Sequence, residues 1–462
     1  MSPAAGGSAA LTRLARSQES MWEVLCAFSP PDPSRTPYNV FEAATWDFPV
    51  DPDGFRAAVD EVMRRHHALR IVFTDTNVDP LIRVEPEVDT AITFADLTAE
   101  PAERRTTMQA SILAYERGRT YDLRRGPLWR ATLLRVNETQ HLVAVTMSHV
   151  IADGWSAGVF HRDLRTAYLA RAGQGPPLLA LRLPYPAAMA SLELDEAELR
   201  RRQKYWQERL TPLPVEWPYP PALDDPGVDV TAEASLGLPI PGEVAAKVRT
   251  FARRHRLTPF LLLLASYRIL LGARTGWSRV VIATASTGRE GLGTGADDLV
   301  GQFAQNSYLA STIDLHATLT EAIEAVRASI YGAMRHQASF YEIARAVNPD
   351  FDSMRPWPFF HLYHAWFHGG AHAVPRSQEQ LSGRRSRNRP PPVTPDAQLV
   401  RLWAKRVAPG LTVQLDGRGA VMNYNPTMYP QSLMRDTLQG YVAVLSALLA
   451  DPDQRISDVK FS

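Results

Sequence analysis

The residues best suited to chemistry lie in one short stretch, VTMSHVIADGWS at positions 145–156. An apolar strand pattern ends at Ser148 and His149, and Asp153 and Gly154 follow closely. A histidine can take up a proton near neutral pH, and the end of a strand leaves one side of its ring open. The Asp-Gly pair indicates a turn that can bring its carboxylate beneath the histidine. In isolation, a purely structural histidine is the commoner explanation of such a pattern.

Helical and strand patterns alternate along the chain and supply the elements that would position this stretch. The periodicity predicts helices at 53–67, 102–119, 158–171, 195–210, 242–255, 259–272, 319–347 and 431–450. It predicts strands at 69–73, 128–136, 141–148, 280–286, 359–367, 411–416 and 420–424. This mixture predicts an α/β (mixed α+β) fold.

A proline-rich stretch at 173–186 predicts a boundary between two lobes near residue 175. The N-terminal lobe, 1–175, would carry His149, and the C-terminal lobe would span 176–462. Residues 369–396 are rich in Gly, Ser, Arg and Pro and poor in apolar side chains, so we expect a mobile surface loop there.

Composition and charge argue against several classes of function. A net charge of +1 over 462 residues gives no field that would attract nucleic acid or an anionic membrane. The single cysteine, Cys26, excludes an internal disulfide and is predicted to be a buried thiol in a reducing compartment. The apolar run at 260–271 is too short to span a bilayer, and no apolar leader precedes it. We expect a cytoplasmic protein without a metal centre.

The stretch around His149 resembles the HHxxxDG motif of nonribosomal peptide synthetase condensation domains, members of the chloramphenicol acetyltransferase superfamily. Further segments resemble the family's other motifs in the expected order. They are SQESMW at 17–22, RHHALRIVF at 65–73, LPYPAA at 183–188, VGQFAQNS at 300–307, RHQASFYE at 335–342 and DSMRP at 352–356. The resemblance covers the chain from about Ser17 to Phe461.

This resemblance implies two chloramphenicol acetyltransferase-like lobes in a V shape, with an active-site tunnel between them. It implies that His149 is catalytic, that Asp153 forms a structural salt bridge with Arg289, and that Gly154 lets backbone approach the site. The tunnel would be lined by Trp155, Ser156, Gln302, Asn306 and Ser307.

The implied reaction is acyl transfer in natural-product biosynthesis. His149 would deprotonate or position an amine or hydroxyl acceptor, which attacks a carrier-bound thioester, and backbone N–H groups near Gly154 would stabilise the oxyanion. No resident cofactor is implied, because the acyl donor arrives on the phosphopantetheine arm of an acyl or peptidyl carrier protein. Since the length leaves no room for other synthetase domains, we expect that carrier in trans, a free or carrier-bound acceptor, and a monomeric enzyme.

One departure from the motif leaves alternatives open. Ser148 occupies the position of the first histidine, which the family uses structurally. Ser148 as a covalent nucleophile is disfavoured, because successive strand side chains point to opposite faces. A catalytically silent docking module and a coenzyme A-dependent acyltransferase remain as alternative functions.

Overall fold

The computed structural model describes residues 11–15, 17–19, 21–22, 38–74, 80–211, 234–349, 363–368, 409–415 and 419–460. The predictions for Cys26 and for residues 369–396 lie outside these ranges. The chain divides into two compact units. Unit 1 draws on Met1–Leu194 and on Thr287–Ala304, here called the crossover segment, and unit 2 draws on Asp195–Ser286 and the described residues from Gln305 onward. The lobes at 1–175 and 176–462 stay a prediction.

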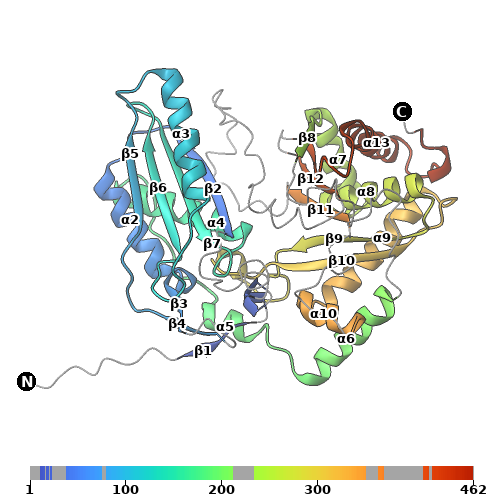
Figure 1. Ribbon diagram of the computed structural model, residues 1–462, viewed down its shortest axis with the longest axis horizontal. Coiled ribbons are helices and arrows are strands. Elements are labelled where there is room, and N and C mark those ends of the chain that lie inside the picture. Colours follow the sequence, from blue (N-terminus) through green and yellow to red (C-terminus); the bar gives the residue numbers. More distant parts are fainter. Residues whose placement is uncertain are drawn as a thin grey trace, which may run out of the picture. The chain divides into compact units, whose positions relative to one another are not determined.

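Unit 1 is built on a four-stranded sheet in the order β2-β7-β6-β5 (Figure 1). The sheet strands are β2 (Asn39–Trp46), β5 (Ile92–Asp96), β6 (Trp129–Arg135) and β7 (His141–Ser148). A smaller sheet joins β1 (Thr12–Arg13), β4 (Leu81–Val84) and β3 (Ile71–Phe73). The unit 1 helices are α2 (Pro52–Arg65), α3 (Ala102–Arg117), α4 (Gly154–Arg171) and α5 (Tyr185–Ala190), with the short η2 (His67–Arg70) and η3 (Ala296–Asp298).

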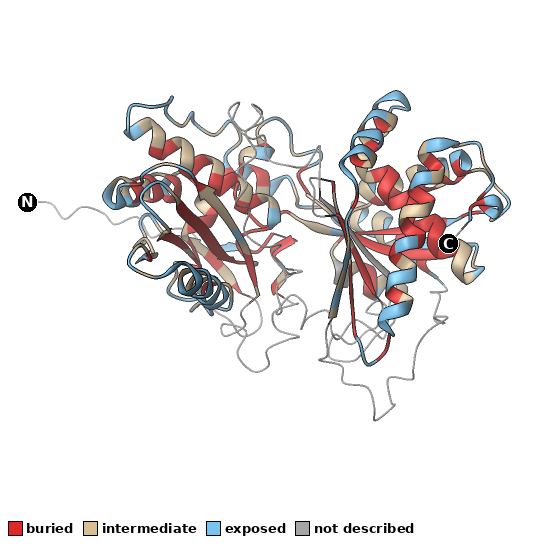
Figure 2. Ribbon diagram, turned by 90° about the horizontal axis from the view of Figure 1, so that it is seen from above, coloured by how far each residue is buried: buried red, intermediate tan, exposed pale blue. Residues whose placement is uncertain are grey.

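The core of unit 1 lies between the large sheet and helices α2 and α4. Every residue of β7 is buried, and alternate side chains such as Val145 and Met147 join the apolar cluster that includes Phe55 of α2 and Phe160 of α4. This strand is therefore fixed on both faces, and Figure 2 shows the buried residues concentrated where sheet and helices meet. A strand held in this way ends at a well-defined point.

Unit 2 is built on a six-stranded sheet in the order β10-β9-β11-β12-β13-β8. Its strands are β8 (Ala234–Leu238), β9 (Arg279–Ser286), β10 (Gln305–Thr312), β11 (Tyr363–His368), β12 (Gly410–Gln414) and β13 (Gly419–Tyr424). Its helices are α6 (Glu196–Leu210), α7 (Gly242–Arg254), α8 (Pro259–Thr275), α9 (Leu319–Arg335), α10 (Phe340–Val347) and α13 (Gln431–Ala450), followed by η5 (Ile456–Asp458). Helix α8 is buried from Leu261 to Gly272, which explains its unbroken apolar sequence.

The structure confirms the mixed α/β fold and corrects some of the predicted elements. The helix predicted at 319–347 is two helices, because Ser339 and Glu342 form a capping box that starts α10 anew. The helix predicted from residue 158 begins at Gly154. Helix α5 and strands β1, β2, β4, β5, β8 and β10 were not predicted at all.

Within the described ranges, no single helix is long and apolar enough to cross a membrane; α7 and α8 satisfy that test only as a pair bent by 107°. The same ranges contain no group of three or more His, Cys, Asp or Glu residues able to hold a metal ion.

Candidate active site

The predicted motif joins the end of β7 to the start of α4. β7 ends at Ser148, and Asp153 is the N-cap of α4, where its carboxylate accepts the Ser156 N–H at 2.9 Å. The Ser156 hydroxyl completes a capping box with the Asp153 backbone. The Asp-Gly pair is therefore a helix start and not a free turn, which is why α4 begins earlier than its apolar periodicity predicts.

The predicted ion pair between Asp153 and Arg289 is present inside unit 1. Arg289 Nη1 lies 2.7 Å from Asp153 Oδ2 and Nη2 lies 3.2 Å from Oδ1, so the contact is bidentate. Both side chains are 1% exposed. Burial raises the pKa of Asp153, but the Arg289 charge and the hydrogen bonds from Arg289 and Ser156 outweigh it, and the pKa is lowered from its usual value.

Asp153 also holds the last residues of the crossover segment. Its Oδ2 accepts the N–H groups of Phe303 and Ala304, each at 3.1 Å. The Ser156 hydroxyl accepts the Gly301 N–H at 3.0 Å and lies 2.8 Å from the Gly301 carbonyl oxygen. Ser156 is fully buried and its hydroxyl is used in these bonds. Ser156 therefore anchors the crossover segment to the start of α4, and its place in the wall of a substrate tunnel stays a prediction.

A second anchor ties the crossover segment to the middle of α4. Asp163 accepts from Arg65 Nε at 2.8 Å and lies 2.9 Å from His66 Nε2, while Arg162 bridges Asp163 and Asp298 at 2.8 Å each. His66 Nδ1 faces the Val300 N–H at 3.5 Å, so the neutral ring donates to Asp163 from Nε2. Burial lowers the pKa of His66 despite the Asp163 charge, which favours this neutral form.

The glycine that the site requires for close packing is Gly288. Its φ is +66°, and a Cβ there would lie 1.7 Å from the Phe303 carbonyl oxygen. Gly154 was predicted to play this role, but a Cβ at Gly154 would meet no described atom within 4 Å. The sequence signal for Gly288 was its place directly after strand β9, between Thr287 and Arg289.

His149 follows directly on the buried strand. Its backbone N–H donates to the Tyr38 carbonyl at 2.9 Å, and its ring stacks on the Tyr38 ring at 4.8 Å between centroids. The ring is half-buried, and its Nδ1 has no hydrogen-bond partner among the described residues. Burial lowers the pKa of His149, against the opposite effects of its own carbonyl, Asp153, Gln302 and the Ala152 carbonyl. The imidazole is therefore neutral at neutral pH, with one nitrogen able to accept a proton.

Ser148 is buried on the sheet face that it shares with Thr146, opposite the face that carries Met147 into the apolar core. It pairs across the sheet with Asn39 of β2. The alternation along β7 therefore gives Ser148 a structural environment within the sheet.

The remaining predicted residues fall in two places. In unit 1, Trp155 is half-buried and its indole N–H donates to the Asp297 carbonyl at 2.9 Å, while Gln302 is buried. In unit 2, Asn306 and Ser307 are neighbours on β10 and therefore point to opposite faces of its sheet. Asn306 is exposed, whereas Ser307 is buried.

Sequence reasoning missed Thr284, which lies directly opposite Ser307 on β9. Both hydroxyls are buried and lack partners among the described residues. Only the pairing of β9 with β10 brings them together, and β10 was not predicted.

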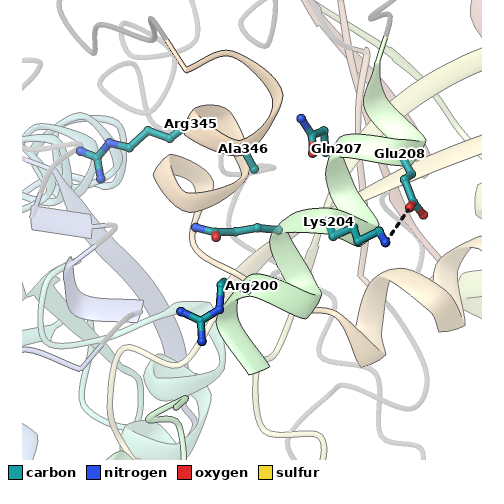
Figure 3. Close-up of a pocket in the computed structure, with 7 residues that line it drawn as sticks. Arg200, Lys204, Gln207, Glu208, Arg345 and Ala346 are labelled. Atoms are coloured by element: carbon teal, nitrogen blue, oxygen red, sulfur yellow. Dashed lines mark ion pairs between the residues drawn. The ribbon is translucent and has the colours of Figure 1, made fainter. Parts of the chain in front are cut away.

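Unit 2 also has an open hollow of about 490 Å³ between α6 and α10 (Figure 3). Its basic lining residues include Arg200, which pairs with Glu196 at 3.1 Å, and Lys204, which lies 3.9 Å from Glu208. None of the predicted site residues lines it.

Comparison with known proteins matches most of the chain to one protein family. Residues 12–356 match the Condensation domain family. The chain is 25% identical over 431 residues to a linear gramicidin synthase of Brevibacillus parabrevis, covering 92% of this chain and 8% of that protein. The chain thus spans a small part of such relatives.

Two solved structures have the same fold. The complex of the X-domain and OxyB from teicoplanin biosynthesis matches with a TM-score of 0.70 and 20% identity, covering 100% of this chain and 99% of that one. The SgcC5 protein from Streptomyces globisporus, in complex with (R)-(-)-1-(2-naphthyl)-1,2-ethanediol and sucrose, matches with a TM-score of 0.69 and 22% identity, covering 96% and 100%.

Proposed function

The chain belongs to the condensation-domain family, and we propose that it joins a carrier-bound acyl or aminoacyl thioester to an amine or hydroxyl acceptor at His149. The observation that carries this proposal is the state of His149. The ring stacks on Tyr38 at the end of β7. Burial lowers its pKa more than the Asp153 charge raises it. A neutral imidazole can accept a proton from an attacking nucleophile at neutral pH.

The proposed reaction breaks one C–S bond and forms one amide or ester bond. The acceptor N–H or O–H donates to His149 while its nitrogen or oxygen attacks the thioester carbonyl carbon. The tetrahedral intermediate then expels the thiolate of the phosphopantetheine arm. The thiolate accepts the proton from the His149 imidazolium and becomes a thiol. In this proposal a backbone N–H near Gly154 stabilises the oxyanion, and the Ser156 N–H does not take part because it donates to Asp153.

Several observations support parts of this proposal. The Asp153–Arg289 pair and the bonds of Asp153 to the Phe303 and Ala304 N–H groups fix this part of the crossover segment before substrate arrives, so little reorganisation is needed. A hydroxyl acceptor is supported by the diol in the SgcC5 complex, and an amide-forming role by the similarity to a gramicidin synthase.

The first test compares wild type with His149→Ala, using acyl groups loaded on carrier proteins and on coenzyme A, with products identified by mass spectrometry. We expect turnover with the carrier-bound donor and a loss of about 10²–10⁴-fold in the variant, the range of general acid–base catalysis. The exposed His316 provides the matched control, and His316→Ala should keep full activity. Equal turnover by wild type and His149→Ala would remove His149 from the mechanism. A preference for the coenzyme A donor would favour a coenzyme A-dependent acyltransferase.

The pH dependence gives an independent check. Because the pKa of His149 is lowered by burial, the acid limb of kcat/KM should lie below the ordinary histidine range. Protonation below that point removes the acceptor nitrogen, so activity falls as pH decreases. An acid limb above the ordinary histidine range would contradict the assigned base.

A docking module is the second candidate function. Ser148 in place of the family's first motif histidine favours it, as does the fold shared with an X-domain bound to OxyB. Ser148→His decides between the two: we expect wild type to be active and the variant to lose about 1–3 kcal/mol of stability through overpacking of the buried site. A wild type inert toward every donor, but active after Ser148→His, would establish the docking role.

A further inference from the structure

Tyr38 lies directly opposite His149, one residue beyond the paired part of strands β2 and β7. The outermost pair of that ladder is Asn39 with Ser148, and the strands are antiparallel, so the next pair outward is Tyr38 with His149. The His149 N–H donates to the Tyr38 carbonyl at 2.9 Å, which continues the ladder to this pair. Side chains directly opposite one another in an antiparallel pair lie on the same face and within contact distance. The ladder itself therefore brings the two rings together.

The rings of Tyr38 and His149 are stacked. Their centroids lie 4.8 Å apart, and their planes differ by 17°. A stack of this kind covers a face of the imidazole and leaves its edge, which carries both nitrogens, free of the phenol ring. Tyr38 belongs to none of the sequence motifs, and its place opposite the histidine comes from the pairing of β2 with β7.

The next residue along the chain fixes the backbone of Tyr38. Asn39 is 1% exposed, and its Nδ2 donates to the Arg117 carbonyl at 3.0 Å and to the Arg119 carbonyl at 2.7 Å, both at the end of α3. A shift of Tyr38 would strain these bonds as well as the ladder. The ring of Tyr38 is therefore attached to a fixed point of unit 1.

The imidazole needs such an external contact to hold its plane. The χ2 torsion of histidine is broad and sets no sharp orientation by itself. We propose that Tyr38 is a positioning residue for His149, whose stacked ring fixes the plane of the imidazole and excludes water from one of its faces. The contact belongs to the structure, whereas its effect on turnover rests on the proposed function.

The stack can be read by NMR of protein labelled in its histidine rings, with the His149 signals assigned by their loss in His149→Gln. We expect the ring current of Tyr38 to move the His149 ring protons upfield in wild type. This shift should persist in Tyr38→Phe, which keeps the ring, and disappear in Tyr38→Ala. Both variants keep the backbone carbonyl that binds the His149 N–H, so they test the side chain alone.

An NMR titration of the same samples tests the exclusion of water. Burial is the largest influence on the pKa of His149 and lowers it, whereas the charge of Asp153, which is paired with Arg289, raises it. Tyr38→Ala admits water to one face of the ring, so the pKa should rise toward the ordinary value of about 6.5. Loss of the attraction between the phenol ring and an imidazolium acts the other way, but it is the smaller effect. Tyr38→Phe should leave the pKa unchanged.

Turnover of the carrier-bound donor tests the consequence for catalysis. Tyr38→Ala should lower kcat by about tenfold with an unchanged KM, the upper range for one aromatic pair. The acid limb of its pH profile should move up together with the pKa of His149, and Tyr38→Phe should stay within about twofold of wild type. Phe251→Ala is the matched control, because it removes an equivalent stack on His255, with centroids 4.1 Å apart, in α7 of unit 2. It should change neither the His149 signals nor kcat.

An absent ring-current shift in wild type, or an unchanged His149 pKa or kcat in Tyr38→Ala, overturns the proposal. So does an equal loss of kcat in Tyr38→Phe, which would assign the effect to the hydroxyl. If Tyr38→Ala does not fold, Tyr38→Leu removes the ring but keeps an apolar side chain, and its ring-current shift and kcat decide in the same way. A wild type without turnover toward any donor, whose shift and pKa nevertheless respond to Tyr38→Ala as expected, supports the contact and refutes the proposed function instead.

Discussion

Two buried arginines differ in the groups that bind the guanidinium. Arg289 of unit 1 meets the Asp153 carboxylate in a bidentate pair. Arg268 of unit 2, on α8, is 0% exposed and binds only neutral oxygens among the described residues, including the Ser311 hydroxyl at 2.9 Å, the Ser311 carbonyl and the Ser278 carbonyl. Its Nη1 has no partner in the same part of the chain.

The difference is one of role: Arg289 helps to position the residues of the candidate active site, whereas Arg268 connects structural elements of unit 2. The carboxylate on Arg289 also binds Ser156, Phe303 and Ala304, so one ion pair fixes α4 and the crossover segment beside His149. Arg268 joins α8 to the ends of β9 and β10, and burial lowers its pKa to about 10. Removing a charge should therefore be far more damaging in unit 1 than in unit 2.

The largest effect is expected from breaking the ion pair. Asp153→Ala and Arg289→Met each leave the other charge buried without its partner, which should reduce the free energy of unfolding by about 3–5 kcal/mol. Urea unfolding and turnover should both be measured, and both should fall. The exposed Glu324–Arg327 pair supplies the control: Arg327→Met should change stability by about 0.5 kcal/mol or less. Wild-type stability in Asp153→Ala would refute the structural role of the pair.

The Asp153–Arg289 contact was predicted from the resemblance to condensation domains, in which an arginine follows a comparable strand, and it is present in the structure. Strand β7 and helix α13 were predicted with their observed bounds, since each has an uninterrupted pattern. The start of α4 was missed because an Asp-Gly pair suits a turn and a helix N-cap alike, and only the bond to Ser156 decides.

Other features depend on contacts between distant segments and could not be derived from local patterns. The need for Gly288 comes from the Phe303 carbonyl, which the crossover segment folds back against it. The break between α9 and α10 is different, because the Ser339-x-x-Glu342 capping box was present in the sequence.

An intermediate effect is expected when the charge is removed but the shape is kept. Asp153→Asn should cost about 1.5–3 kcal/mol at pH 7, the range of hydrogen bonds to a charged group. The folded-state pKa of Asp153 is lowered, so its contribution is complete above the unfolded carboxyl pKa and is lost as pH falls through the folded one. The stability gap between wild type and variant should therefore hold from pH 7 to about 5 and narrow below it. A gap that is constant down to strongly acidic pH would show that Asp153 carries no charge in the folded protein.

The smallest effect is expected at Arg268, and it tests the other half of the comparison. Arg268→Met loses bonds to Ser311 and Ser278 but also removes a charge that burial disfavours. An arginine pKa lowered to about 10 corresponds to roughly 3 kcal/mol against the protonated form in the folded protein. The two effects oppose one another, so unfolding at pH 7 should change by about 1 kcal/mol or less, well below the loss at Arg289.

The pH dependence of Arg268→Met gives the sign of this effect. Between about pH 10 and 12.5 the folded state binds fewer protons at Arg268 than the unfolded state, so wild type gains stability relative to the variant as pH rises. Other groups titrate alike in both proteins, and the difference in unfolding free energy between pH 8 and 10.5 isolates Arg268. A loss above about 3 kcal/mol at pH 7 would mean that an anion balances Arg268 after all, because only a buried pair that loses one member costs that much. The contrast between the two arginines would then disappear.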